Sequence, residues 1–249
     1  MISSSKASVK HNLTLLDKGV NELMKKQPQI SEERILEASW ELLGEEGLEK
    51  FSLRRLADRL QIQAPSLYWY FKSKQALYQR LANDVSRVIL EEFRHEGGWK
   101  EQLTELAATV RSVLRRYPCS TQLMMMTLPH EPDIIRFTNR MLLCVESTPL
   151  DQAEKMQVVT TLVNYVYFFV LDDYQHERNV ATMLQEQKLP PGEEMVQVMD
   201  SMNEGDVSLF RRMYTTGLFK LMGTDTSFDF GLKVILLGIE QVIKEHEQQ

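Results

Sequence analysis

The densest group of chemically informative residues lies in the stretch SLYWYFKSK at 66–74, where four consecutive aromatic side chains precede two lysines. Tyrosine and serine hydroxyls can bond to phosphates or base edges, and lysines add positive charge. The alternative is that the rings belong to a hydrophobic core. A helix of less than two turns has one buried stripe, which Leu67 and Phe71 fill at i and i+4. At least two of the other three rings are therefore predicted to be exposed.

Basic charge is concentrated around this stretch. Between Lys50 and Arg80 there are seven basic residues and one acidic residue, a local charge of +6, although the whole chain carries −6. From residue 81 onward, 16 basic and 25 acidic residues give −9. A basic segment followed by an acidic body indicates that one end of the molecule contacts phosphates and the other does not.

Two other groups of residues have side chains suited to metal binding or catalysis. Asp172 and His176 lie at i and i+4 beside two further acids, but two ligands from one helix do not complete a metal site, and a solvated acidic helix end explains them. Cys119 and His130 lie in proline-broken loops with no third group to orient them. We therefore expect no metal, no cofactor and no enzymatic activity. Without a CxxC motif, Cys119 and Cys144 are expected to be free buried thiols.

The aromatic stretch forms the second part of a helix-turn-helix pattern. Residues 53–60 place apolar side chains at i, i+3, i+4 and i+7 and three arginines on the other face, which predicts a short amphipathic helix with a basic side. After a turn at 61–64, Pro65 begins a second short helix. In such a motif the second helix enters the major groove and the first crosses the DNA backbone. Lys74, in the first turn of the following helix, adds its charge to the free amides there.

The remaining elements are also predicted to be helical. Helix starts are expected at Ser31, Ser52 and Ser73, and Gly47 is expected to end the first helix. Beyond Gly98, the expected helices are 99–116, 133–146, 151–176 and 228–246, with a less regular helical stretch at 193–222. No alternating strand pattern competes with them. The predicted fold class is all-α.

The run ILEASWELLGEEGLEKFSLRRLADRLQIQAPSLYWYFKSKQALYQRL at 35–81 resembles, without a gap, the DNA-binding domain of the tetracycline-repressor (TetR) family of bacterial transcriptional regulators. The resemblance implies DNA contacts by Arg54, Pro65, Ser66, Tyr68, Trp69, Tyr70 and Lys74. One departure is Gln61, where the family usually has glycine. A left-handed backbone at that position costs a non-glycine residue about 1 kcal/mol.

The rest of the chain resembles, more weakly, the tetracycline-repressor branch of that family. MMMTLPHEPD is similar to the segment that lines the drug pocket of the branch, and FGLKVILLGIEQVI is similar to its last helix. In that branch the last helix and the one matching 151–176 form a dimeric four-helix bundle, which implies a homodimer. The i, i+4, i+7 spacing that such an interface requires is present in Val158, Leu162, Tyr165, Phe169 and Asp172.

The same resemblance implies an effector pocket lined by Leu90, Leu106, Val110, Met124, Met125, Thr127, Leu128, Cys144 and Tyr165. Where the branch has the polar residues that hold metal-bound tetracycline, this chain has Leu90, Leu106, Met124 and Leu128. These side chains offer no ligand for a hard cation. We therefore expect the pocket to bind neither magnesium nor tetracycline but an apolar or amphipathic molecule. The consecutive methionines at 124–126 fit core filling and pocket lining equally well.

Together these features predict a flexible arm at 1–28, a three-helix DNA-binding domain at 29–80 and a helical ligand-binding and dimerisation domain at 81–249. With no apolar run long enough to span a membrane and no secretory signal, the protein is expected to be cytoplasmic. The predicted function is a repressor that binds a palindromic double-stranded DNA operator as a homodimer and is released by a small-molecule effector. The alternative is a helical ligand-binding protein or enzyme that has lost operator binding.

Overall fold

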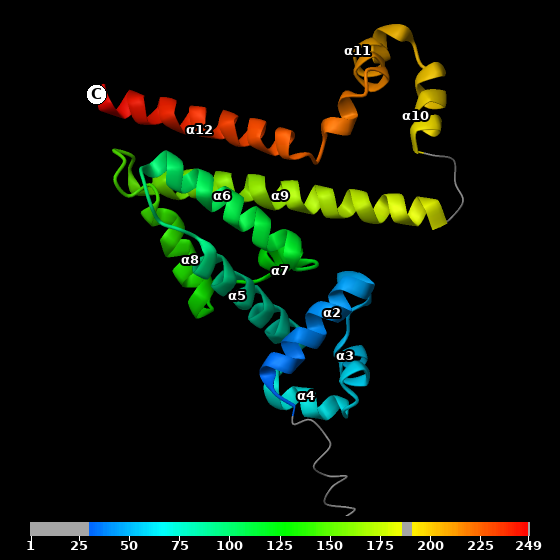
Figure 1. The fold of residues 1–249 in the computed structure, drawn as a ribbon, viewed down its shortest axis with the longest axis vertical. Helices are drawn as coiled ribbons and strands as arrows, with labels where there is room; N and C mark the ends of the chain where they lie inside the picture. The colour runs from blue at the N-terminus through cyan, green and yellow to red at the C-terminus, as the bar shows by residue number, and fades with distance from the viewer. Residues whose placement is uncertain (1–29, 186–190, 249) are drawn as a thin grey trace, which may run out of the picture.

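The computed structural model describes residues 30–185 and 191–248, and within those ranges every regular element is a helix (Figure 1). The prediction of an all-α fold is confirmed. The arm predicted at 1–28 lies outside the described residues. Among the helices that the structure describes, none is both long enough and apolar enough to cross a bilayer.

Three helices form the N-terminal unit: α2 (Glu32–Lys50), α3 (Leu53–Leu60) and α4 (Ala64–Tyr70). The predicted serine caps are confirmed. Backbone amides three residues downstream donate to the hydroxyls of Ser31 at 3.3 Å, Ser52 at 3.2 Å and Ser73 at 3.0 Å. Each bond satisfies an amide that the first turn of a helix leaves unpaired, so these starts are fixed by local sequence.

Two residues with a left-handed backbone shape this unit. Gly47, with φ 76°, interrupts α2 at the predicted stop, but the helix resumes and runs to Lys50. Gln61, with φ 56° and ψ 41°, ends α3, and its amide donates to the carbonyl of Asp58 at 3.1 Å. The glutamine therefore adopts the left-handed turn for which the family uses glycine.

The body of the molecule consists of α5 (Lys74–Glu92), α6 (Trp99–Arg116), α7 (Ser120–Met126), α8 (Pro132–Leu143), α9 (Gln152–Gln185), α10 (Pro191–Asp200), α11 (Glu204–Thr215), the 3₁₀ turn η1 (Leu218–Leu221) and α12 (Asp225–Glu247). The helix predicted at 151–176 continues to Gln185, because no glycine or proline interrupts it. The stretch predicted at 193–222 is divided into α10, α11 and η1.

The helices enclose two clusters of buried side chains, one in the N-terminal unit and one in the body. Helix α5 passes through both: Leu77 and Leu81 belong to the first cluster, and Val85 and Ile89 to the second. Figure 1 shows α5 running from the end of α4 into the body. A displacement of α5 relative to the body is therefore also a displacement of the N-terminal unit.

Helices α9 and α12 run side by side in opposite directions, and α10, α11 and η1 project beyond one end of this pair (Figure 1). The projecting lobe has few fully buried side chains, among them Met199 and Val207. Many of its large apolar side chains are exposed: Met195, Val196, Val198, Met202, Leu209, Phe210, Met213, Leu218, Leu221 and Met222. The lobe therefore leaves much of its apolar surface uncovered in the single chain.

Candidate nucleic-acid interface and effector region

Helix α4 presents three aromatic rings to solvent. Leu67 and Phe71 point into the core, with exposed fractions of 0% and 5%. Tyr68, Trp69 and Tyr70 are exposed by 48%, 82% and 40%. The prediction that at least two rings lie outside the core is confirmed, and in fact all three do. Pro65 is exposed and Ser66 is half-buried in the first turn of this helix.

One of the three exposed rings also has an internal role. The hydroxyl of Tyr70 donates to the carbonyl of Ile30 at 2.7 Å, so Tyr70 connects α4 to the chain just before α2. This bond spans forty positions and has no signature in the sequence pattern. Tyr68 and Trp69 are therefore the rings whose exposure is least explained by the fold.

Lys74, predicted to add its charge to the free amides at the start of α5, has contacts inside the protein. Its ammonium donates to the carbonyl of Phe51 at 2.8 Å and lies 5.2 Å from the ring centroid of Tyr78. The side chain is half-buried and connects the α2–α3 junction to α5. The carbonyl and the ring hold the ammonium in place at the edge of the helix-turn-helix. Contact with DNA remains a prediction for this residue.

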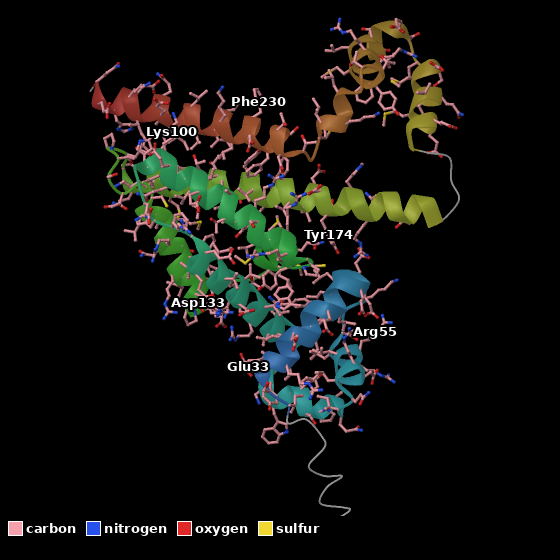
Figure 2. The ribbon with its side chains drawn as sticks, in the orientation of Figure 1. Glu33, Arg55, Lys100, Asp133, Tyr174 and Phe230 are labelled. Atoms are coloured by element: carbon pink, nitrogen blue, oxygen red, sulfur yellow. The ribbon has the colours of Figure 1, made fainter. Side chains whose placement is uncertain are left out.

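The three arginines of α3 have unequal partners. Arg55 pairs with Glu46 at 2.9 Å, and Arg59 pairs with Glu45 at 2.6 Å and Glu41 at 3.0 Å. Arg54 is exposed and has no acidic partner among the described residues. Figure 2 shows Arg55 beside α3. The acids of α2 thus balance two of the three charges and leave Arg54 available for a phosphate.

The residues predicted to line an effector pocket differ widely in burial. Leu106, Val110 and Cys144 are fully buried in the core of the body, and burial raises the pKa of the Cys144 thiol to about 11. Partial burial is found for Leu90, Met124, Thr127 and Tyr165, whereas Met125 and Leu128 are exposed. The three methionines are accordingly divided: Met124 packs against the core, and its two neighbours do not.

Tyr165, the ninth predicted pocket residue, connects two helices. Its hydroxyl donates to the carbonyl of Phe228 at 2.8 Å, and its ring stacks on the ring of Phe228 with centroids 5.5 Å apart. Phe169 packs edge-on against the same ring at 5.1 Å. These contacts hold α12 against α9 within one chain.

The predicted dimer seam needs a related correction. Leu162 is buried inside the protomer, and Tyr165 and Phe169 face Phe228, so these residues do not face outward. Exposed apolar side chains of this pair of helices are instead Met156 and Phe168 on α9 and Phe230, Val234, Leu237 and Val242 on α12. We call Phe168, Phe230, Val234 and Leu237 the outer face. A hollow of about 450 Å³ between α9 and α12, bordered by Val158 and Val234, adjoins it.

A set of side-chain amides that the sequence interpretation missed joins α5 to the α7–α8 loop. Gln75 donates to the carbonyl of Met126 at 3.2 Å. Gln79 donates to the carbonyl of Leu128 at 2.5 Å and accepts from the amide of Leu128 at 3.1 Å. The third amide, Asn83, donates to the carboxylate of Asp133 at 3.0 Å and accepts from its backbone amide at 2.8 Å.

Gln75, Gln79 and Asn83 lie at i, i+4 and i+8, and we call them the amide ladder. The side chains of Gln79 and Asn83 are almost completely buried, and their bonds reach partners at the partly buried start of the loop and of α8. Figure 2 shows Asp133 at the start of α8, next to α5. The signal in the sequence was three side-chain amides spaced i, i+4 and i+8, which places them along one face of α5.

The candidate metal and catalytic residues do not form sites in the described part of the chain. Asp172 and His176 are exposed, and among the described residues no three potential ligands gather around one point. Cys119 and Cys144 are free and buried, as predicted. Cys119 lies 3.2 Å from the hydroxyl of Tyr174, whereas His130 is exposed in the α7–α8 loop.

Comparisons with known proteins cover most of the chain. The model described as "Bacterial regulatory proteins, tetR family" matches residues 35–81, and the model described as "Tetracyclin repressor-like, C-terminal domain" matches residues 94–243. A tetracycline repressor protein of class G from Vibrio anguillarum is 28% identical over 219 residues, covering 84% of this chain and 92% of the relative. The class D protein from Escherichia coli is 25% identical over 210 residues, covering 79% and 96%.

Solved structures give the same architecture. A possible TetR family transcriptional regulator from Streptomyces coelicolor A3(2) superposes with a TM-score of 0.67 at 22% identity. The superposition covers 85% of this chain and 100% of the other. At this level of identity the similarity establishes the fold, with the N-terminal helix-turn-helix and the larger helical body in the same arrangement.

Proposed function

The chain belongs to the tetracycline-repressor family of bacterial regulators, and we propose that it represses transcription as a homodimer on a palindromic operator in the cytoplasm. Repressors of this family bind operator DNA and are released by small molecules. The proposal for this chain adds the contacting residues, the dimer surface and the class of effector. We further propose that residues 29–80 form the DNA-binding domain and residues 81–249 the effector-binding domain.

The observation that carries the proposal is the exposure of Tyr68 and Trp69 on a helix whose other face is fully buried. A folded monomer gains nothing by exposing a ring of this size, and an aromatic side chain with a hydroxyl is suited to a surface of phosphates and bases. We propose that α4 enters the major groove, with Pro65, Ser66, Tyr68, Trp69 and Tyr70 at the contact. Arg54 and Lys74 contribute positive charge at its edges.

The outer face of α9 and α12 supports a homodimer. Phe230, Val234 and Leu237 lie at i, i+4 and i+7 on α12, and this stripe is exposed in the single chain. Its continuity with the apolar hollow beside Val158 favours another helical surface as the partner. A second copy placed by a two-fold axis would cover both stripes at once and would set the spacing of two α4 helices on DNA.

The proposed effector is an apolar or amphipathic molecule that binds in the body. The relatives are named as tetracycline repressors, but Leu90, Leu106, Met124 and Leu128 supply no oxygen or imidazole ligand for a magnesium–drug complex. The amide ladder provides a route from the body to DNA, because it holds the α7–α8 loop against α5. An effector that moves this loop would move α5 and hence α4.

Operator binding tests the proposal directly. A gel-shift series with DNA from upstream of the protein's own gene should show binding that competitor DNA of scrambled sequence does not remove. The affinity should fall steeply with salt, because each phosphate contact releases counterions. Absence of a sequence-specific shift at any salt concentration would instead support the alternative, a helical ligand-binding protein or enzyme without operator binding.

A further inference from the structure

A hollow of about 370 Å³ lies between α5 and α8, in the region proposed for the effector. Leu90, one of the predicted pocket residues, and Leu143 give it apolar borders. Three arginines, Arg87, Arg136 and Arg140, also line it. A volume of this order accommodates a small organic molecule. The mixture of leucine and guanidinium makes this hollow different from the apolar one between α9 and α12.

The charges around this hollow do not balance. Arg87 pairs with Asp84 at 2.8 Å and with Glu91 at 2.7 Å, and Arg136 pairs with Asp133 at 2.6 Å. Arg140 is half-buried, and within the described ranges it has no acidic partner. The acids that border the hollow are therefore already engaged, and one guanidinium is left without a counter-charge.

We infer that the effector is an amphipathic anion whose carboxylate or similar acidic group pairs with Arg140 and whose apolar part lies against Leu90 and Leu143. This inference rests on the proposed function and names the chemical class of its effector. A planar guanidinium matches a carboxylate through two parallel hydrogen bonds, and such bonds are stronger than neutral ones. A cationic molecule would be repelled, and a neutral apolar molecule would leave Arg140 unpaired.

The position of Arg140 supports this assignment independently of its charge. The thiol of Cys144 donates to the backbone carbonyl of Arg140 at 3.4 Å, and Cys144 itself is buried in the core, so Arg140 lies on the last turn of α8 beside that core. The same hollow is bordered by Asp133, the residue held by Asn83 of the amide ladder. A molecule bound to Arg140 therefore lies next to the contact that joins α8 to α5.

The test compares carboxylates with alcohols of the same skeleton on the full-length protein. The four pairs are hexanoate with hexanol, octanoate with octanol, decanoate with decanol, and naphthoate with naphthylmethanol. All are used below the concentration at which they form micelles. Binding is measured by thermal shift and calorimetry without DNA. At least one carboxylate should bind the wild-type protein about five- to tenfold more tightly than its alcohol. Arg140→Gln should abolish that preference and leave the alcohol unaffected.

Arg136→Gln is the matched control, because Arg136 lies on the same helix and wall but is already paired with Asp133. It should keep the preference for carboxylate, as should Arg140→Lys, which retains the charge. The inference is overturned if no carboxylate is preferred over its alcohol, if Arg140→Gln keeps the preference, or if Arg136→Gln loses it equally. Operator binding without any probe is measured separately, so a failure of the repressor function appears in that assay alone.

Discussion

Two surfaces of this molecule expose aromatic rings, and the chemistry around each ring separates their roles. On α4, Tyr68 and Trp69 belong to a segment with a local charge of +6, which includes the exposed Arg54 of α3. On α12, Phe230 is followed by Val234 and Leu237 at i+4 and i+7, and the exposed Lys233 is the one charged residue between Phe230 and Leu237. Ring exposure is similar in the two regions, so exposure alone does not identify a partner. A polar, positively charged surface favours DNA, and a purely apolar stripe favours another protein surface.

The outer face should show the largest effect when it is disrupted. Phe230→Glu places a charge at a position that is 69% exposed in the single chain, so the protomer should fold normally. Burying that charge at a dimer interface is unfavourable, and sedimentation should detect monomers. Because a monomer reads one half-site, operator affinity should fall about a hundredfold or more. Thr104→Glu, at an exposed position of α6 outside this face, is the control and should remain dimeric. A dimeric Phe230→Glu protein would exclude this face as the interface.

The aromatic surface of α4 should give the next largest effect. Tyr68→Ala should lower operator affinity about ten- to a hundredfold, since it removes both a ring and a hydroxyl from the contact. Thermal stability should change little, because surface substitutions usually alter the free energy of unfolding by less than about 0.5 kcal/mol. Leu67→Ala, one residue away but fully buried, should instead cost about 2–5 kcal/mol of stability. If Tyr68→Ala is equally destabilising, the ring belongs to the core.

The contrast between Leu67 and Tyr68 also shows what the sequence can predict. Helical spacing places Leu67 and Phe71 on one face, and a helix this short cannot bury the other rings. The serine caps are equally local, because a hydroxyl three residues before an amide is enough to start a helix. In the body, the same reasoning predicted each long helix. These features depend on neighbours within about one helical turn.

Features that depend on distant residues were not predictable in the same way. The partners of Arg55 and Arg59 come from α2, and the carbonyl that binds Lys74 belongs to Phe51. Whether a leucine such as Leu106 or Leu128 is buried or exposed depends on how α6, α7 and α8 pack, and helical periodicity does not contain that information. The predicted pocket was for this reason divided between core and surface.

The amide ladder joins the two regions, and its removal should weaken their coupling. Gln79→Ala removes two hydrogen bonds between a nearly buried side chain and the backbone of Leu128, which should cost about 1–3 kcal/mol of stability. Chemical denaturation measures this change, and operator release by the effector should require a higher effector concentration. Gln75→Ala is the matched control, because Gln75 is exposed and makes one bond to the loop. Equal effects of the two substitutions would contradict a special role for the buried amides.

The charged side of α3 should have a smaller effect, visible mainly in the salt dependence. Arg54→Ala should weaken operator binding several-fold and reduce the slope of log affinity against log salt by about one phosphate. Arg55→Ala should change the slope less, because Glu46 already balances that charge. Gel-shift titrations at several salt concentrations compare the two directly. The same slope for Arg54→Ala and the wild-type protein would remove Arg54 from the interface.

The smallest expected effect concerns the turn between the two helices of the motif. Gln61 holds φ 56°, a left-handed conformation that costs a residue with a Cβ about 1 kcal/mol relative to glycine. Gln61→Gly should therefore raise the free energy of unfolding by up to about 1 kcal/mol, less the entropy that glycine adds to the unfolded chain. Gln61→Ala keeps the Cβ and should bring no such gain, so the difference between the two variants in urea denaturation isolates the backbone effect. If both variants are equally stable, the turn is not strained, and glutamine is as suitable there as glycine.

Operator affinity should be unchanged in either variant, because the substitution alters the strain of the turn and not the surface of α4.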